Sequence, residues 1–254
     1  MINWKSIKYS AKASTLAYRQ PKRTRLVNKL LCPESNTLAY SWITTNDCNS
    51  NSNKLYITFK GSSTTKDLFD SIDCHKYMYN EKDNIQIHKG FWNKYTNLRL
   101  QLYNLIYSYS NKVNEIICTG HSLGAALASI CALDIYYTFQ IKASLHTFGS
   151  PRVGNVDFAD MMPNILNEHY RVTYMDDVVS HIPMGFEYRH IYGNHIHFLD
   201  DEVYVIQNDD KREFTTDMIG LSMITSHTMV YYIQALSNKV SGGNVPPLPP
   251  RSLR

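Results

Sequence analysis

The sequence has 254 residues, a formal net charge of +4, and 43% hydrophobic and 19% charged residues. This composition is typical of a folded globular protein, and the length suits one α/β domain. No apolar run reaches the roughly 18 residues that a membrane-spanning helix needs, and the charge is too small to indicate a nucleic-acid partner. We expect a single domain over residues 1–239, with neither a membrane span nor bound nucleic acid.

The cysteines and the N-terminal segment indicate the cellular compartment of the protein. The five cysteines are an odd number without C-x-x-C spacing, which favours reduced thiols over disulfides or a metal site. The first twenty residues lack the apolar core of a secretory signal, and no N-x-[ST] sequon occurs. The sequence therefore predicts a cytoplasmic protein.

The N-terminal segment is strongly basic, because eight Lys and Arg residues precede the first acid, Glu34. Trp4, Ile7, Ala11 and Tyr18 lie at helical spacing, which indicates an amphipathic helix packed on the domain with a solvated basic face. The same charges would also suit peripheral contact with an anionic lipid surface, or a targeting peptide. All three interpretations remain open from the sequence.

The middle of the chain alternates β-rich runs with helical patterns, which is typical of a mostly parallel sheet covered by helices. The polar stretch "TTNDCNSNSNK" should form an exposed hairpin loop. The expected strands are "TLAYSWIT", "KLYITFK", "EIICTG", "SLHTFGS", "HYRVTYM" and "VYVIQ", and the expected helices cover 90–109, 122–139, 157–166 and 225–237.

The last segment, "SGGNVPPLPPRSLR", is rich in Gly and Pro and cannot continue a helix. Residues 240–254 are therefore expected to form a flexible tail outside the domain. "PPLPPR" also matches the P-x-x-P-x-R type of SH3 ligand, so a weak SH3-type partner is one hypothesis and a plain disordered tail is the other.

The stretch "TGHSLGAALA" contains the G-x-S-x-G pattern around Ser122. A buried strand pattern precedes it and a helical pattern follows, which is the context of a nucleophile elbow. Gly120 and Gly124 are required there, because a Cβ at either position would crowd the adjoining strand or helix. The helix N-terminus adds partial positive charge near the attacking oxygen.

A serine nucleophile needs a base and an acid that orients the base. In this architecture the chain order is Ser, acid, His. Asp176 and Asp177 follow an apolar strand, and His227 lies further along in "TSHTMVYYI". The required order is therefore present, with either aspartate available as the acid.

The sequence resembles the class 3, or fungal-type, lipases, which have the α/β-hydrolase fold. The likeness covers most of residues 11–236 and rests on several motifs in the family's order. They are "FKGSSTTKDLFDSID" for F-R-G-[ST] and the lid, "IHKGFW" for V-H-x-G-F, "TGHSLGAALA" for the elbow, "HTFGSPRVGN" for T-F-G-x-P-R-V-G-[ND], "RVTYMDDVV" for the acid loop and "HTMVYY" for H-x-x-Y, with the first tyrosine one position later than in the family pattern.

This resemblance implies Ser122 as nucleophile, Asp177 as the orienting acid, with Asp176 as a turn residue, and His227 as general base and acid. It implies an oxyanion hole built from Ser62 and the backbone N–H of Leu123. Lys60 stands where the family has Arg, which keeps the charge and loses the planar fork.

The resemblance also implies a lid over 64–71, "TTKDLFDS". Leu68 and Phe69 would cover the site in water and face lipid when the lid opens, while Lys66 and Asp67 stay wet. The alternative is that Leu68 and Phe69 only pin a loop on the core.

Four histidines between His181 and His197 raise the question of a metal site. "HIH" at 195–197 points two side chains to one face of a strand, but no carboxylate or Cys is spaced to complete a tetrahedral site. Ordinary hydrogen-bonded histidines are therefore expected, without a metal or an organic cofactor.

Together these features predict a serine hydrolase that cleaves carboxylic esters of lipids, at a membrane or droplet surface, through an acyl-enzyme on Ser122. An acylglycerol is the first substrate expected, and a phospholipid cleaved at its sn-1 position is the second. The remaining hypothesis is a catalytically idle lipase-like module that binds lipid or a protein partner.

Overall fold

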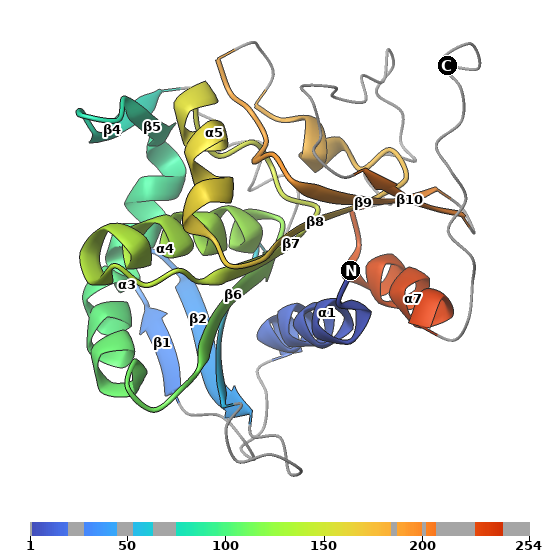
Figure 1. Cartoon of the computed structure of the whole chain (residues 1–254), viewed down its shortest axis with the longest axis horizontal. Helices are drawn as coiled ribbons and strands as arrows, with labels where there is room; N and C mark the ends of the chain where they lie inside the picture. The colour runs from blue at the N-terminus through green and yellow to red at the C-terminus, as the bar shows by residue number, and fades with distance from the viewer. Residues whose placement is uncertain are drawn as a thin grey trace.

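An eight-stranded sheet forms the centre of the molecule in the computed structural model (Figure 1). The structure describes residues 2–19, 28–44, 53–62, 75–183, 187–199, 202–206 and 227–240. In spatial order, the strands are β1 (Asn28–Cys32), β2 (Thr37–Thr44), β3 (Lys54–Phe59), β6 (Glu115–His121), β7 (Ser144–Phe148), β8 (His169–Tyr174), β9 (Asn194–Leu199) and β10 (Glu202–Ile206).

The sheet is parallel in its middle and antiparallel at both edges. Neighbouring strands from β3 to β9 pair in parallel, while β1, β2 and β3 form an antiparallel run at one edge and β9 and β10 pair antiparallel at the other. A separate antiparallel hairpin consists of β4 (Lys76–Asn80) and β5 (Ile85–His88). The carboxyl ends of β6, β7 and β8 therefore meet at one edge of the sheet, where α/β folds bind ligands.

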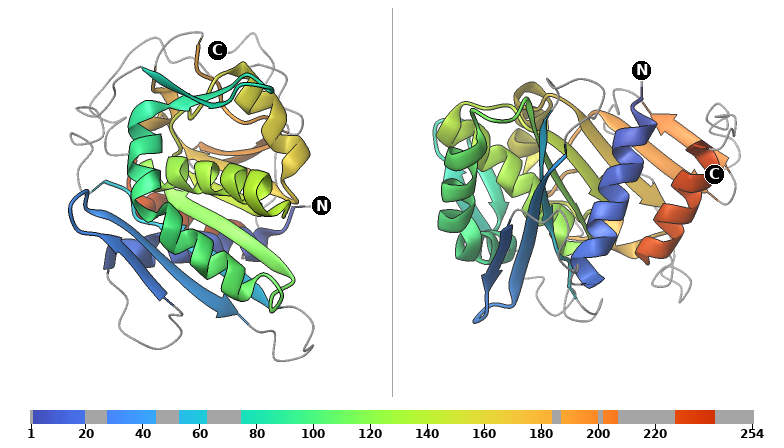
Figure 2. Two further views of the ribbon diagram at one scale, coloured as in Figure 1. Left: turned by 90° about the vertical axis from the view of Figure 1, so that its left-hand side faces the viewer. Right: turned by 90° about the horizontal axis from the view of Figure 1, so that it is seen from below.

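Helices cover both faces of this sheet (Figures 1 and 2). On one face lie α3 (Lys89–Tyr109), α4 (Leu123–Phe139) and α5 (Val156–Ile165), which pack into the larger hydrophobic core. On the other face α1 (Trp4–Arg19) and α7 (Met229–Val240) lie side by side, as the right-hand view of Figure 2 shows. A short 3-10 helix, η1 (Val178–His181), follows β8.

Two helices show how composition determines position. Residues 123–135 of α4 are all buried, because this helix is wedged between the sheet and α3. In α1, Ile7, Ala11 and Ala17 are buried against the sheet while Lys5 and Lys12 are exposed. The predicted N-terminal amphipathic helix is thus confirmed, with its basic residues on the solvated side.

The predicted mostly parallel sheet flanked by helices is confirmed, and its six expected strands are all present. Sequence reasoning missed β1 and the β4–β5 hairpin. In β1 only Leu30 is buried, and β4 has no buried residue, so neither strand shows the alternating pattern that marks a half-buried strand.

Several expected segments lie outside the described residues. These are the hairpin loop at 45–52, the lid residues 64–71 and all of the tail from residue 241 onward. The antiparallel pairing of Thr44 with Lys54 confirms the hairpin that this loop connects. Among the described helices, none is long and apolar enough to span a bilayer.

Candidate active site

Ser122 occupies a strained turn between β6 and α4. Its φ of 59° and ψ of −131° lie outside the ordinary regions for a non-glycine residue, and its N–H donates to the Phe148 carbonyl at 3.0 Å. A Cβ on Gly120 would strike the Gly124 backbone, and one on Gly124 would strike the Phe59 carbonyl. The predicted need for glycine at both positions is therefore confirmed, and the serine lies at the N-terminus of α4.

Asp177 lies just beyond the carboxyl end of β8 and is 1% exposed. It caps η1, since its Oδ1 accepts the Val179 N–H at 3.0 Å. Asp176 is exposed and turned to solvent. Of the two aspartates, Asp177 is the one that faces the interior.

His227 contacts this carboxylate directly. Its Nδ1 lies 2.9 Å from Asp177 Oδ1 and 2.8 Å from Oδ2. Because a carboxylate only accepts, Nδ1 carries a proton, and in the neutral ring Nε2 then keeps its lone pair. Nε2 is buried and makes no hydrogen bond to any described residue, the Ser122 hydroxyl included. A base held in this tautomer is ready to accept a proton.

Gly149 leaves the space in which this pair sits. It follows β7 and has a φ of +53°, a conformation that favours glycine. A Cβ there would lie 2.5 Å from Asp177 Oδ2 and 3.1 Å from His227 Nδ1. Any side chain at this position would therefore push Asp177 and His227 apart.

Tyr232, on α7, completes the coordination of the acid. Its hydroxyl donates to Asp177 Oδ2 at 2.6 Å, and its side chain is fully buried. Burial, together with the Asp177 charge, raises the pKa of Tyr232 well above its usual value. The hydroxyl therefore keeps its proton, and donates it to the carboxylate, beyond the pH at which an ordinary tyrosine ionises.

His121 directly precedes Ser122 and contacts His227. Its ring stacks on that of His227, with centroids 4.4 Å apart and planes 28° apart. The Tyr18 hydroxyl, from α1, lies 3.0 Å from His121 Nδ1. Burial and the neighbouring His227 lower the pKa of His121 well below 6.5, so it stays neutral. A neutral neighbour does not oppose protonation of His227.

Ser62 and Leu123, the expected oxyanion groups, line one pocket of about 220 Å³. Ser62 follows the end of β3, and Leu123 is the first residue of α4. The structure thus brings both residues to one pocket, beside the turn at Ser122. The lid residues Lys66, Asp67, Leu68 and Phe69 lie outside the described residues.

The histidines considered for metal binding make hydrogen bonds instead. His190 Nε2 lies 2.7 Å from the Ser180 carbonyl, and His195 and His197 both contact the Thr173 hydroxyl, at 2.7 and 2.8 Å. Within the described ranges, no group of three His, Cys, Asp or Glu residues is arranged to hold a metal ion.

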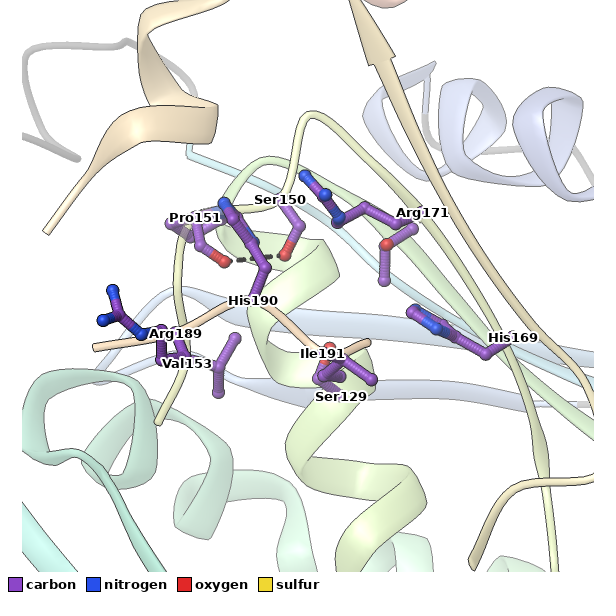
Figure 3. A pocket seen from close by; sticks show the side chains of 10 residues that line it. Ser129, Ser150, Pro151, Val153, His169, Arg171, Arg189, His190 and Ile191 are labelled. Atoms are coloured by element: carbon purple, nitrogen blue, oxygen red, sulfur yellow. Dashed lines mark hydrogen bonds between the residues drawn. The ribbon is translucent and has the colours of Figure 1, made fainter. Parts of the chain in front are cut away.

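A small cavity lies beside His190 and His169 (Figure 3). It measures about 10 Å³, and His169, Arg171, His190 and Ser150 are among the residues that line it. Burial and the nearby Arg171 lower the pKa of His169 to about 3. The space is no larger than one water molecule needs. It therefore has no room for an organic cofactor.

The family model for "Lipase (class 3)" matches residues 56–187, which is more than half of the chain. The chain belongs to the class 3 lipase family. The matched segment includes the elbow and the acid loop, whereas α1 and His227 lie outside it.

Two named relatives illustrate the range of this family. A "Lipase" from Rhizomucor miehei is 30% identical over 135 residues, which are 51% of this chain and 37% of the relative. The "Phospholipase A(1) DAD1, chloroplastic" of Arabidopsis thaliana is 34% identical over 108 residues, 38% of this chain and 24% of the relative. The chain thus spans about a third or less of each relative's length.

A solved structure extends the likeness to the fold. Rhizomucor miehei lipase in complex with its propeptide superposes with a TM-score of 0.70 at 23% identity, over 91% of this chain and 77% of that one. The expected α/β-hydrolase fold of this class 3 lipase family member is therefore confirmed.

Sequence reasoning missed four members of the site, namely Tyr18, His121, Gly149 and Tyr232. His121 directly precedes Ser122 in "TGHSLG", but its stacking on His227 has no sequence signal. "HTMVYY" contains two adjacent tyrosines, and helical periodicity cannot choose between them because His227 precedes the first residue of α7. Only the glycine in "TFGS", inside a matched motif, was open to detection.

Proposed function

We propose that this protein hydrolyses carboxylic esters of lipids through an acyl-enzyme on Ser122, with acylglycerols as the first substrates to test. The observation that carries the proposal is the state of His227, whose Nδ1 is held by Asp177 while Nε2 is buried without a partner among the described residues. The ring stacks on His121, the residue directly before Ser122. Membership of the class 3 lipase family adds support.

In the first half-reaction, the Ser122 Oγ attacks the ester carbonyl carbon while His227 Nε2 takes its proton. The oxyanion that forms accepts hydrogen bonds from the groups at Ser62 and Leu123, each worth about 3 to 4 kcal/mol. When the tetrahedral intermediate collapses, the bond to the alcohol breaks and the leaving oxygen takes the proton from His227. Asp177 stays ionised throughout and stabilises the imidazolium.

In the second half-reaction, His227 removes a proton from water and the resulting hydroxide attacks the acyl carbon. The carboxylic acid leaves, and Ser122 recovers its proton from His227. Both steps use only groups of this chain, the ester and water. Because catalytic hydrogen bonds often tighten only with substrate bound, the hydrogen bond from Ser122 to Nε2 would form in the complex.

The lid and the location are further parts of the proposal. Residues Lys66 to Phe69 would cover the site in water and open at a lipid surface, as in the family resemblance. A cytoplasmic setting, with peripheral contact on membranes or droplets, is supported by the free thiols at Cys32, Cys118 and Cys131. The SH3-type partner of the Pro-rich tail stays a hypothesis about residues outside the described ranges.

A fluorophosphonate probe tests the nucleophile. The wild-type protein should be labelled at Ser122, and Ser122→Ala should abolish labelling and lower kcat on a soluble short-chain ester about 10⁴- to 10⁶-fold. Unfolding curves in urea should match for the two proteins, which separates loss of chemistry from loss of fold. If the folded wild type remains unlabelled, the proposal is wrong and an idle lipid-binding module takes its place.

A further inference from the structure

A cleft of about 340 Å³ lies between the β4–β5 hairpin, α3 and the end of α4. Most of its described lining is aromatic, from Tyr77, Tyr79, Trp92 and Tyr137. Tyr137 lies in the last turn of α4, and Ser122 precedes the first residue of this 17-residue helix, so the two are roughly 20 Å apart along its axis. The cleft is therefore separate from the proposed active site, and the proposed reaction does not use it.

The four rings form one continuous wall. Tyr77 stacks on Trp92, with centroids 4.8 Å apart and planes 14° apart. The other side of the wall continues through Tyr79, which meets Trp92 at 5.5 Å and Tyr137 at 5.5 Å, both edge to face. Tyr77 is 38% exposed, while Trp92 is 7% exposed and forms the base. Because these rings already contact one another, a ligand that packs on them would order few side chains, which favours binding.

An acidic group lies at the Tyr137 end of this wall. The Tyr137 hydroxyl donates to Asp83, and the Asp83 N–H donates to the Asn80 amide oxygen at 3.1 Å, so two lining residues hold Asp83 at the rim. No ion pair joins Asp83 to a described cation. Arg99 also lines the cleft, but Asp134 neutralises its charge at 2.8 Å. The rim would therefore attract a ligand that carries a positive charge.

This combination suits a proline-rich segment with a basic residue. Grooves lined by aromatic side chains bind such segments in the polyproline II conformation. The chain itself contains one, "VPPLPPR" at 245–251, which lies outside the described residues. Polyproline II has three residues per turn, so Pro246 and Pro249 would share one face and pack on the rings. Arg251 follows them closely and would meet Asp83.

The position of α7 indicates which molecule supplies this segment. α7 ends at Val240 and packs against β8, whereas α3 packs against β1 and β2 on the opposite face of the sheet (Figures 1 and 2). β8 and β2 are four strand spacings apart, which is about 19 Å. A straight chain from Val240 to Pro246 reaches at most about 22 Å, and it would also have to pass around the sheet. A second molecule meets no such limit.

We propose that the cleft binds segment 245–251 of a second copy of this chain, so that the molecules associate head to tail. The interface is heterologous, because the cleft of one copy takes the segment of the next and each copy keeps one of the two surfaces unoccupied at the ends of a row. The inference does not depend on the proposed ester hydrolysis, since the cleft lies at the far end of α4 from Ser122.

Sedimentation velocity of the full chain at increasing concentration measures this association. The weight-average mass of the wild type should rise with concentration. The dissociation constant should increase about tenfold in Tyr77→Ala, which changes the cleft, and in Pro249→Ala, which changes the segment. Tyr107→Ala removes an 81% exposed tyrosine of α3 outside the cleft and is the matched control. A wild type that stays monomeric up to about 1 mM would overturn the proposal.

A mixture of the two variants tests the head-to-tail arrangement. Tyr77→Ala keeps the segment and Pro249→Ala keeps the cleft, so together they should form a one-to-one dimer at a concentration where neither self-associates. Absence of this dimer would show that the cleft and the segment are not partners. Urea unfolding and kcat on a soluble ester should match the wild type in both variants, which separates loss of association from loss of fold.

Exchanged charges test the pairing of Arg251 with Asp83. Asp83→Arg and Arg251→Asp should each weaken association about tenfold, and the chain that carries both changes should recover most of it. Without such recovery, the assigned pairing of these two residues is wrong.

Two other occupants are distinguished by binding to the Pro249→Ala chain, whose own segment competes weakly. A labelled peptide of residues 243–252 should bind, and about tenfold more weakly after Tyr77→Ala is added. Peptide binding without self-association of the wild type would mean that the cleft takes a proline-rich segment of another protein. A tryptophan fluorescence response to maltohexaose, with none to the peptide, would make the cleft a carbohydrate site. Either outcome rejects the second-copy assignment.

Discussion

Asp134 and Asp177 are both buried carboxylates that accept hydrogen bonds from tyrosine hydroxyls, but their remaining partners differ. Asp134, on α4, receives two hydrogen bonds from the Arg99 guanidinium, at 2.8 and 2.9 Å. The hydroxyls of Tyr79, Tyr95 and Tyr103 complete its shell, at 2.9, 2.7 and 3.2 Å. This carboxylate has a permanent cation and no free position.

The hydrogen-bond partners of Asp177 include a group that can take up and release a proton. Its partners are the Val179 N–H, the Tyr232 hydroxyl and a histidine, His227, whose second nitrogen makes no hydrogen bond to a described residue. A neutral imidazole can gain a charge during reaction, whereas the Arg99 guanidinium cannot lose one. The difference teaches that both oxygens of the Asp134 carboxylate are fully engaged by donors, while in the proposed active site Nε2 of His227, like Nε2 of His121, is buried without a hydrogen-bond partner among the described residues.

The largest effect should follow from Asp177→Asn. The amide would donate where the carboxylate accepts, which would hold His227 in the tautomer that has a proton on Nε2 and no lone pair for Ser122. We expect kcat on a soluble ester to fall about 10⁴-fold. The exposed neighbour supplies the control, because Asp176→Asn should leave kcat nearly unchanged.

Unfolding in urea, run beside the kinetics, checks that the Asp177→Asn protein is folded. Equal losses of kcat in the two asparagine variants would contradict the distinction between the inward and the exposed aspartate.

Asp134→Asn should act on stability instead. It leaves the Arg99 charge without its carboxylate in a partly buried site that ties α3 to α4, so the free energy of unfolding should fall by about 3 to 5 kcal/mol. Because Arg99 keeps some access to water, the lower end is expected. The midpoint and slope of urea unfolding measure the loss, and kcat of the folded protein should change less than twofold.

Asp160→Asn on the exposed face of α5 is the control for loss of a helix carboxylate. A fall of kcat by orders of magnitude in folded Asp134→Asn would remove the contrast between the two carboxylates.

The smallest effects should come from the tyrosine hydroxyls, which the two regions share. Burial, with the adjacent aspartates, raises the pKa of both Tyr95 and Tyr232 well above 10. Each folded-state hydroxyl therefore keeps its proton above pH 10, where the unfolded chain releases it, so the free energy of unfolding should decline as pH rises past 10. The expected slope is about 1.4 kcal/mol per pH unit for each tyrosine.

Tyr95→Phe and Tyr232→Phe should each remove one tyrosine's contribution to this slope, about 1.4 kcal/mol per pH unit. Urea unfolding between pH 9 and pH 11 measures the slope. Each should also cost about 1 to 3 kcal/mol at neutral pH, because a buried carboxylate loses a donor. Only Tyr232→Phe should also lower kcat, because its hydroxyl is a donor to the carboxylate that holds His227. An unchanged kcat in Tyr232→Phe would mean that this hydroxyl is purely structural.

Part of this site could be predicted from local patterns. The strand before Ser122, the helix after it and the glycines on either side are all encoded within about twenty residues, so the turn and its strain follow from neighbours in the chain. The buried strands were likewise predicted from local runs of apolar residues. By contrast, "MDDVV" offered two adjacent acids, and only the family resemblance chose Asp177, since local sequence does not tell which of two side chains turns inward.

The sequence by itself determined the order of elements, the elbow at Ser122 and the residue types of a Ser, acid and His set. Tertiary structure alone decided that Tyr232 donates to Asp177 from 55 residues away and that Tyr18 meets His121 across 103 residues. It also placed Lys60, which follows β3, and Lys94, on α3, at one pocket. The reason is physical, because these contacts depend on how parallel strands and their crossover helices pack, and no local pattern records the distance between their ends.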